Sequence, residues 1–296
     1  MFIATLAILA GSLSSCGGFQ RQATPPSYPV IRVHIAPKAG LSALPVTIAQ
    51  KLGFFAHEHI RVQWRPANES VVDIGPAGSS WPIAGYLSTR PDLILVSPTP
   101  DPAFRLHSLD HLPLAASPET APDRNLAEKI LAKHHAHLSH WSVMPTHVIE
   151  QLWSHHRLPW ALVNLVQAQR LKTIDPSTVV LAWLGASTGP IPNWGIAVKQ
   201  SNMPIVRFLS ALNLALWYLH TTTPTTLAQE LSNNRPNPPL AHLVGTAQRY
   251  QYWPLTTVPD APTYNRRKTM WDTSWPPFSQ GVDGKAAHQA LSETGK

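Results

Sequence analysis

Histidine is the side chain whose number and clustering in this sequence come closest to a metal site. Fifteen histidines occur, and the segments KHHAHLSHW (133–141) and SHHR (154–157) hold several of them close together. On a helix, His134 and His137 would be neighbours one turn apart. A zinc site needs three or four converging ligands, and no Asp or Glu lies within the first segment. We therefore interpret these histidines as an exposed helix face and expect no metal.

Two common catalytic motifs are missing from the sequence. It contains no paired-carboxylate pattern and no phosphate-binding loop. Its one cysteine, Cys16, allows neither a disulfide framework nor a cysteine-based zinc site. We expect a protein that is not an enzyme and that needs no cofactor.

The charge of the chain is basic but spread out. Lys and Arg number 23 against 16 Asp and Glu, which gives a formal net charge of +7. The densest basic run, Arg266 to Lys268, is only three residues long. A nucleic-acid-binding protein is expected to carry a basic stripe or patch, so we exclude nucleic acid as a partner.

The single cysteine lies in the segment MFIATLAILAGSLSSCGG (1–18). Residues 2–10 are apolar apart from Thr5, which is typical of an export signal. This run is too short to cross a bilayer, which takes about 20 apolar residues. The residues Leu-Ser-Ser before Cys16 resemble the lipobox of bacterial lipoproteins, which implies cleavage after residue 15 and a lipid on Cys16. The alternative is a plain signal peptide, because no Lys or Arg precedes the apolar run.

Apolar stretches of two periods alternate along the rest of the chain. Residues 31–37 alternate as a β-strand does, and the helix expected over 44–52 has Pro45 in its first turn and Gly53 at its end. Strands alternating with helices indicate the α/β class, with two doubly wound lobes. Further strands are expected at 59–66, at the start of 71–87, at 92–100 and at 178–187, and helices at the end of 71–87 and at 123–138, 145–157, 158–171, 203–220, 224–232, 239–250 and 260–272.

Four segments resemble the periplasmic-type solute-binding proteins of ABC importers. The branch concerned takes up nitrate, sulfonates and taurine, and includes proteins that bind the pyrimidine precursor of thiamine. The first segment, GLSALPVTIAQKLGFFAHEHIRVQW (40–64), is similar to the family's opening at Pro45, Ala49, Gly53, Phe54, Phe55, Ile60 and Val62. The others are VVDIGPAGSSWPIAGYL (71–87), LGASTGPIPNWGIAVK (184–199) and QRYQYWP (248–254). All four occur in the family's order within residues 31–272.

This resemblance implies two lobes joined by two crossovers, with the ligand bound in the cleft between them. The lobes of such a protein close on the ligand by a hinge motion. The expected parts are a signal peptide at 1–15, a lipid-anchored flexible tether at 16–29, lobe one at 30–98 plus 194–275, lobe two at 99–193, and a loose C-terminal tail at 276–296.

The ligand is expected at loops that follow strand ends, where helix N-termini offer N–H groups and aromatic rings offer faces. Ser79 and Ser80 would equally suit helix N-caps, and Trp81 and Trp194 would equally suit the core. Glu119 in the cleft would repel an anion. The candidate ligand-binding residues are Gly40, Leu41, Ser79, Ser80, Trp81, Ser97, Ser117, Glu119, Thr120, Asn164 and Trp194.

The predicted function is that of an extracytoplasmic lipoprotein, anchored through Cys16 to the outer face of the cell membrane. It is expected to be a monomer that binds a sulfonate- or nitrate-like anion or a pyrimidine-like heterocycle and delivers it to an ABC permease and its ATPase. One alternative is a divergent lipoprotein that acts as a sensor or surface-binding protein without transport. Another is a pyrimidine-synthesis enzyme on the same fold, but such enzymes carry a cysteine-rich motif that this chain lacks.

Overall fold

The strands form two separate five-stranded sheets in the computed structural model, which describes residues 28–37, 39–77, 81–270 and 275–294. Lobe one is built on the order β2 (Arg61–Trp64), β1 (Val30–Ile35), β3 (Val72–Pro76), β10 (Trp194–Val198) and β4 (Ile83–Ser88). Lobe two is built on the order β7 (His140–Val143), β6 (Pro113–Ala116), β8 (Ala161–Val163), β5 (Ile94–Ser97) and β9 (Val179–Trp183). The predicted α/β class with two lobes is confirmed.

Both sheets are mixed rather than wholly parallel. In lobe one, β1 pairs in parallel with β2 and β3, whereas β10 runs antiparallel to β3 and β4. In lobe two, β6 pairs in parallel with β7 and β8, whereas β5 runs antiparallel to β8 and β9. The antiparallel strand in each sheet is the one by which the chain enters from the other lobe.

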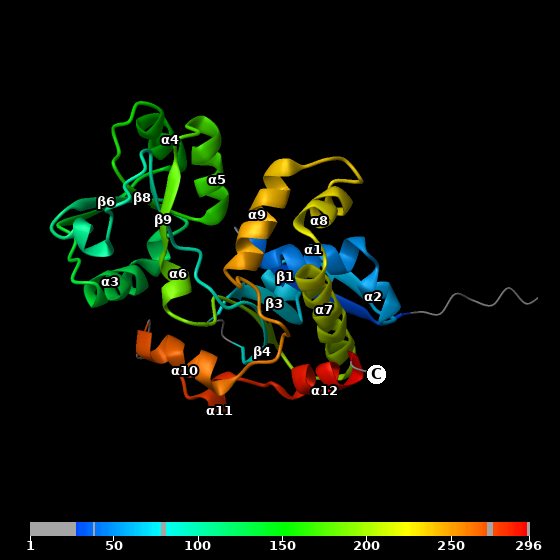
Figure 1. Ribbon diagram of the computed structural model, residues 1–296. Helices are drawn as coiled ribbons and strands as arrows, with labels where there is room; N and C mark the ends of the chain where they lie inside the picture. The colour runs from blue at the N-terminus through cyan, green and yellow to red at the C-terminus, as the bar shows by residue number, and fades with distance from the viewer. Residues whose placement is uncertain (1–27, 38, 78–80, 271–274, 295–296) are drawn as a thin grey trace, which may run out of the picture.

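Helices pack around each sheet, and Figure 1 shows those of lobe two grouped apart from those of lobe one. Lobe two carries α3 (Arg124–Lys133), α4 (Thr146–Ser154), α5 (Leu165–Ile174) and the short α6 (Leu184–Ser187). Lobe one carries the 3₁₀-helix η1 (Gly40–Ala43), α1 (Leu44–Lys51), α2 (Phe54–His57), α7 (Met203–Thr221), α8 (Pro224–Leu231), α9 (Pro238–Arg249) and α10 (Ala261–Met270).

The longest helix, α7, forms for reasons that are visible in the sequence. The Asn202 side chain caps it by accepting the Ile205 N–H at 3.2 Å, and a proline occupies the first turn. Its apolar stripe, including Leu212 and Leu216, is fully buried against α1 and α2. Each such side chain contributes about 1.5–3 kcal/mol on burial, so α7 is the main support of lobe one.

Several segments differ from the predicted secondary structure. Residues 184–187, predicted to end a strand, form the helix α6, and the strands β6, β7 and β8 were not predicted. Residues 83–88 form the strand β4, not a helix, because all six are buried and Gly85 lies close to the backbone of Thr257. The helix expected at 158–171 begins only at Leu165, after β8, because Asn164 caps it there. The helix expected at 123–138 ends at Lys133, so His134 and His137 do not share one helix face.

The C-terminal segment 276–296 was expected to be loose, and that expectation was wrong for the described part. Residues 278–281 form the short helix α11 (Phe278–Gly281), and α12 (Lys285–Thr294) packs against α7 (Figure 1). The buried side of α12 consists of Ala286, Ala287 and Ala290. Alanines remove little area from water, which is why this face has no strong apolar stripe in the sequence.

The first crossover lies earlier than expected. Residues 94–97 were assigned to lobe one, but β5 pairs with β8 and β9 and therefore belongs to lobe two. The two crossovers run side by side, because the Ile191 N–H donates to the Thr89 carbonyl and the Asn193 N–H to the Ser88 carbonyl. The connection between the lobes is thus a pair of hydrogen-bonded segments at 89–93 and 188–193. Within the described residues, no helix has the length and apolar character needed to cross a membrane.

Candidate functional site

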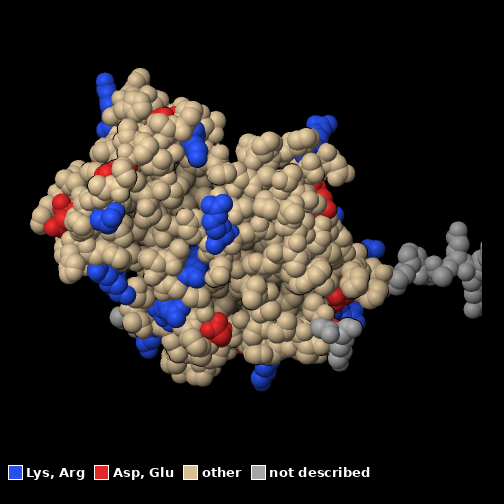
Figure 2. Space-filling model, in the orientation of Figure 1, with Lys and Arg blue, Asp and Glu red and all other residues tan. Residues whose placement is uncertain are grey.

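A cavity of about 370 Å³ lies between the two lobes. Figure 2 shows the surface hollowed between the lobes in the orientation of Figure 1. Segments from both lobes and from both crossovers meet around it. The lining residues are Pro37, Ala39, Gly40, Leu41, Ser42, Pro76, Asp92, Pro118, Glu119, Asp123, Asn164, Val166, Asn193, Trp194, Tyr252 and Arg267.

Five of the predicted ligand-binding residues meet at this cavity. Gly40 and Leu41 come from η1, Trp194 from the start of β10, and Glu119 and Asn164 from loops of lobe two. These residues are up to 154 positions apart in the chain. The fold therefore brings them together, although their contact with a ligand stays a prediction.

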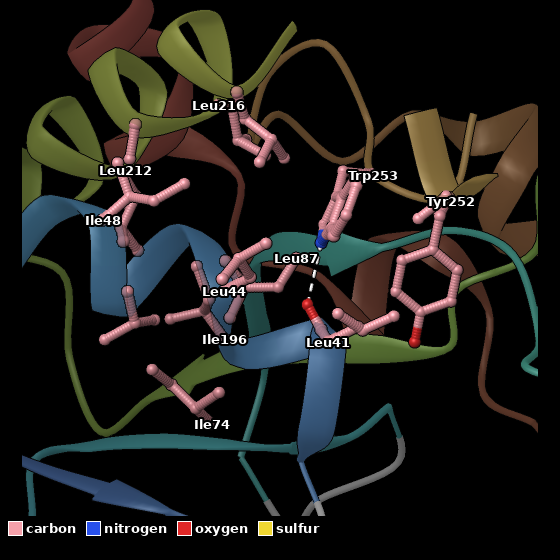
Figure 3. Packing of buried hydrophobic residues seen from close by; sticks show 14 of the residues in the cluster. Leu41, Leu44, Ile48, Ile74, Leu87, Ile196, Leu212, Leu216, Tyr252 and Trp253 are labelled. Atoms are coloured by element: carbon pink, nitrogen blue, oxygen red, sulfur yellow. Dashed lines mark hydrogen bonds between the residues drawn. The ribbon is translucent and has the colours of Figure 1, made fainter. Parts of the chain in front are cut away.

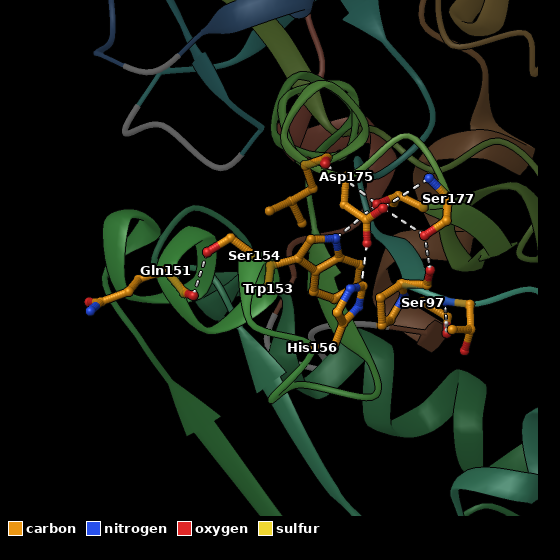
Figure 4. Close-up of polar contacts among 11 residues, drawn as sticks. Ser97, Gln151, Trp153, Ser154, His156, Asp175 and Ser177 are labelled. Carbon is orange, nitrogen blue, oxygen red and sulfur yellow. Dashed lines mark hydrogen bonds and ion pairs between the residues drawn. The ribbon is translucent and has the colours of Figure 1, made fainter.

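Three other predicted residues lie elsewhere. Ser117 is fully buried, and the Thr120 hydroxyl donates to the carbonyl oxygens of Ser117 and Leu162 at 3.0 and 3.2 Å. Both side chains fix the turn that points Glu119 at the cavity. Ser97 lies at the end of β5, where its hydroxyl accepts the Thr99 N–H, close to the Ser177 hydroxyl that donates to the carbonyl of residue 98 (Figure 4).

Trp81 is not among the described residues that line the cavity. Trp81 is partly buried, and the Lys199 ammonium lies 4.9 Å from the centre of its ring. Ser79, Ser80 and Cys16 lie outside the described residues, as do the expected signal peptide and most of the tether.

The lobe-one side of the cavity is held by aromatic residues of the core. The Trp253 indole N–H donates to the Leu41 carbonyl at 2.9 Å, which fixes η1 at the cavity edge (Figure 3). The neighbouring Tyr252 hydroxyl lies 2.7 Å from the Ser42 hydroxyl. Gly40 has a φ of +50°, in the left-handed region that glycine tolerates best. The loop therefore enters η1 in a conformation that a side chain would strain.

The lobe-two side is built on the start of α5. Asn164 accepts the Gln167 N–H at 2.8 Å, and the Gln167 side chain accepts the Asn164 N–H at 3.1 Å, which is a reciprocal cap. The Gln167 amide also donates to Glu119 at 2.5 Å. The Asp92 carboxylate accepts the Leu165 N–H at 2.8 Å. The polar groups of this helix start are thus bonded to one another and to two acidic side chains.

Two carboxyl groups of the cavity, those of Asp92 and Asp123, have raised pKa values. Burial raises the pKa of Asp92 to about 7, against the effect of its bond from Leu165, and the nearby Asp123 carboxylate adds to the rise. Burial likewise raises the pKa of Asp123 to about 7, against the opposing charge of Arg267. Since removal from water disfavours the charged form, both groups change ionisation near neutral pH.

Four titratable lining residues were not predicted from the sequence: Asp92, Asp123, Tyr252 and Arg267. Asp123 precedes α3 as its N-cap, where an acidic residue is common whether or not a ligand binds. Arg267 on α10 is 8% exposed and donates to the Pro192 carbonyl at 2.6 Å. It lay within a basic run that was considered only as a nucleic-acid signal. All four are recognised as lining residues by their position in the fold and not by their residue type.

A second cavity, of about 450 Å³, is lined by lobe one and the crossovers alone. Tyr86, Arg90, His220 and Trp253 are among its residues, and none comes from lobe two. For metals, the described part of the chain holds no group of three or more His, Cys, Asp or Glu side chains placed to bind an ion.

No protein-family model matches the sequence, and no curated protein matches it. Solved structures do. The periplasmic aliphatic sulphonate-binding protein SsuA from Escherichia coli superposes with a TM-score of 0.65 at 11% identity, over 87% of this chain and 92% of that one. The chain has the fold of the periplasmic solute-binding proteins. The predicted resemblance to their sulfonate branch is confirmed at the level of fold.

Two other solved structures show what this fold accommodates. The alkanesulfonate-binding protein SsuA from Xanthomonas axonopodis pv. citri, bound to MOPS, matches with a TM-score of 0.60 at 11% identity, over 90% of this chain and 99% of that one. The C27S mutant of DSZB, in complex with biphenyl-2-sulfinic acid, matches with a TM-score of 0.63 at 9% identity, over 90% and 100%. DSZB is a desulfurization enzyme, so the same fold serves binding and catalysis.

Proposed function

We propose that this protein captures a small solute in the cavity between its lobes and delivers it to an ABC permease. The observation that carries the proposal is the cavity itself, which both lobes and both crossovers line in a chain with a solute-binding fold. A site shared by two lobes gives a ligand more contacts when the lobes approach each other. Binding therefore favours the closed arrangement.

The crossovers supply the hinge in this proposal. They are two short segments, 89–93 and 188–193, and the second contains Gly189 with a φ of +73°. Asn193 lines the cavity and its side chain donates to the Arg90 carbonyl at 3.2 Å, so it connects the cavity to both crossovers. A solute that displaces these groups would act directly on the hinge.

Binding without catalysis agrees with the chemistry of the lining. Of the described lining residues, none is a cysteine, and the one hydroxyl pair, Ser42 and Tyr252, has no histidine beside it among them. We also propose that the protein works outside the cytoplasm, attached to the membrane by a lipid on Cys16. A mass measurement of the mature N-terminal peptide tests the anchor, since a diacylated Cys16 is expected there.

A thermal-shift screen of solutes, with two tryptophan variants, tests the binding proposal. Val166 lines the cavity and is 43% exposed, whereas Val180 on β9 is 47% exposed and does not line it. A solute at one hundred times its dissociation constant stabilises the protein by about 2.7 kcal/mol. We expect one class of solute to raise the melting temperature of wild type and Val180→Trp but not of Val166→Trp. A panel of anionic, neutral and cationic solutes that leaves the wild type unshifted would contradict solute binding.

A further inference from the structure

The cavity is acidic in a basic protein. Asp92, Glu119 and Asp123 are three of the 16 acidic residues, whereas Arg267 is one of 23 Lys and Arg residues. A cavity lined at random from this chain would carry more basic than acidic groups. Among the described lining residues, the sign of the charge is therefore opposite to that of the whole molecule.

Three hydrogen-bond donors at the start of α5 are already used within the protein. The Leu165 N–H goes to Asp92, the Gln167 N–H to Asn164, and the Gln167 amide to Glu119. A sulfonate or nitrate needs such donors, and here acidic or amide oxygens of the chain itself accept them.

Arg267, the one arginine among the described lining residues, is already engaged by other groups. Its guanidinium donates to the Pro192 carbonyl and lies 4.3 Å from the centre of the Trp275 ring. Its charge also lowers the pKa of Asp123, against the larger effect of burial. Arg267 thus interacts with groups of the protein. The aromatic side chains Trp194 and Tyr252 complete the lining, and such rings attract cations through their faces.

We propose that the solute carries a cationic nitrogen group, an ammonium, amidinium or guanidinium, which Asp92, Glu119 and Asp123 receive between the lobes. This inference rests on the proposed solute-binding function and names the class of its ligand. The three carboxyl groups come from the first crossover and from the segment 118–123, and all three line this cavity. A cation there would accept no hydrogen bond and would donate several.

Proton release should accompany binding. The titratable groups that face one another here are Asp92, Glu119, Asp123, Tyr252 and Arg267. Because Asp92 and Asp123 have pKa values of about 7, each holds a proton on part of the molecules at neutral pH. A cation favours their ionised forms and displaces these protons. Its affinity should therefore rise between pH 6 and pH 8, whereas the affinity of a neutral ligand should not.

Calorimetric titration with matched probes tests the charge preference. Benzamidine, benzamide and benzenesulfonate share one ring and differ in the charge of the substituent, and agmatine adds an aliphatic cation. At pH 8 we expect a cation of this set to bind at least tenfold more tightly than benzamide and benzenesulfonate. We expect Asp92→Asn and Asp123→Asn each to weaken it at least tenfold, and the exposed Asp101→Asn to leave it unchanged. Titration in two buffers of different ionisation enthalpy should show proton release.

The possible outcomes distinguish a failure of the cationic ligand class from a failure of the proposed solute-binding function. Tighter binding of benzenesulfonate or benzamide than of either cation, abolished by Val166→Trp, would overturn the cationic class and leave solute binding intact. Cation binding that Asp92→Asn and Asp123→Asn do not weaken would also overturn it. If neither these probes nor the broad solute panel binds, the proposed function and this inference both fail.

Discussion

An Asp92→Asn variant is expected to be more stable than the wild-type protein at pH 8, with a gain that shrinks as the pH falls. Burial raises the pKa of this carboxyl from its ordinary value of 3.8 to about 7. Between these values the folded protein binds a proton that the unfolded chain has lost, so wild-type stability falls as the pH rises from about 4 to about 7. Asparagine has no such proton, and its carbonyl oxygen still accepts the Leu165 N–H.

The expected size of this effect is large for a single substitution. The gain of the variant over wild type should grow by on the order of 2 kcal/mol between pH 5 and pH 8. Urea denaturation at the two pH values measures it. Asp123→Asn should behave in the same way, because burial also raises its pKa to about 7. The exposed Asp101→Asn is the control and should show no such trend.

A lower stability of Asp92→Asn at pH 8 would contradict this account. It would mean that the ionised carboxylate stabilises the start of α5, as a negative charge at a helix N-terminus can do. The expected gain also has a functional meaning. A binding site that becomes more stable when its charge is removed is one whose charge serves a ligand.

The second large effect is expected at Trp253, which is 1% exposed and joins the core of lobe one to the cavity. Trp253→Ala should lower the free energy of unfolding by about 3–5 kcal/mol, because it leaves a large cavity behind. Trp253→Phe keeps most of the packing but leaves the Leu41 carbonyl without its 2.9 Å bond (Figure 3). That variant should lose about 1–2 kcal/mol and bind the solute more weakly.

Trp217→Phe provides the matched control for both variants of Trp253. Trp217 lies on α7 and is 62% exposed, so its replacement should change stability by less than about 0.5 kcal/mol. Chemical denaturation measures the stabilities, and calorimetry measures solute affinity. Unchanged affinity in Trp253→Phe would show that the position of η1 does not depend on this hydrogen bond.

The elements that could be predicted from the sequence are those whose local signals agree with their packing. The helix α7 was predicted from its apolar stripe, which is buried in the structure, and its Asn cap and early proline favour the same start. The end of α1 is similar, because Gly53 adopts the left-handed φ of +76° expected of a glycine after a helix. Here local and tertiary preferences coincide.

The errors in the predicted secondary structure arose where complete burial removes the periodic pattern of apolar residues. All six residues of β4 are buried, so the segment shows neither the alternation of a half-exposed strand nor the stripe of a surface helix. The segment was predicted to be a helix after a small-residue turn, and the structure has a strand. The helix α12 was not predicted, because a buried face made of alanines gives too weak a signal in the sequence to indicate packing.

Part of the cavity lining could be anticipated from the sequence, and the larger part could not. Gly40, Leu41 and Glu119 were found because loops after strand ends bind ligands in such folds. Tyr252 and Arg267 reach the cavity from segments far along the chain, and Asp92 from a crossover whose position was misjudged. The spacing of residues along the sequence does not indicate which distant residues lie together in the fold. The acidic character of the cavity therefore became visible only in three dimensions.

Hydrogen–deuterium exchange, with the solute that gives the largest thermal shift, tests the central claim most directly. The claim is that one ligand contacts both lobes at the cavity that Gly40, Glu119 and Asn164 line. We predict slower exchange on binding in segments 39–42, 117–124 and 164–168 together, with segment 106–112 unchanged. Protection confined to one lobe, or centred on the second cavity at residues 251–263, would contradict it.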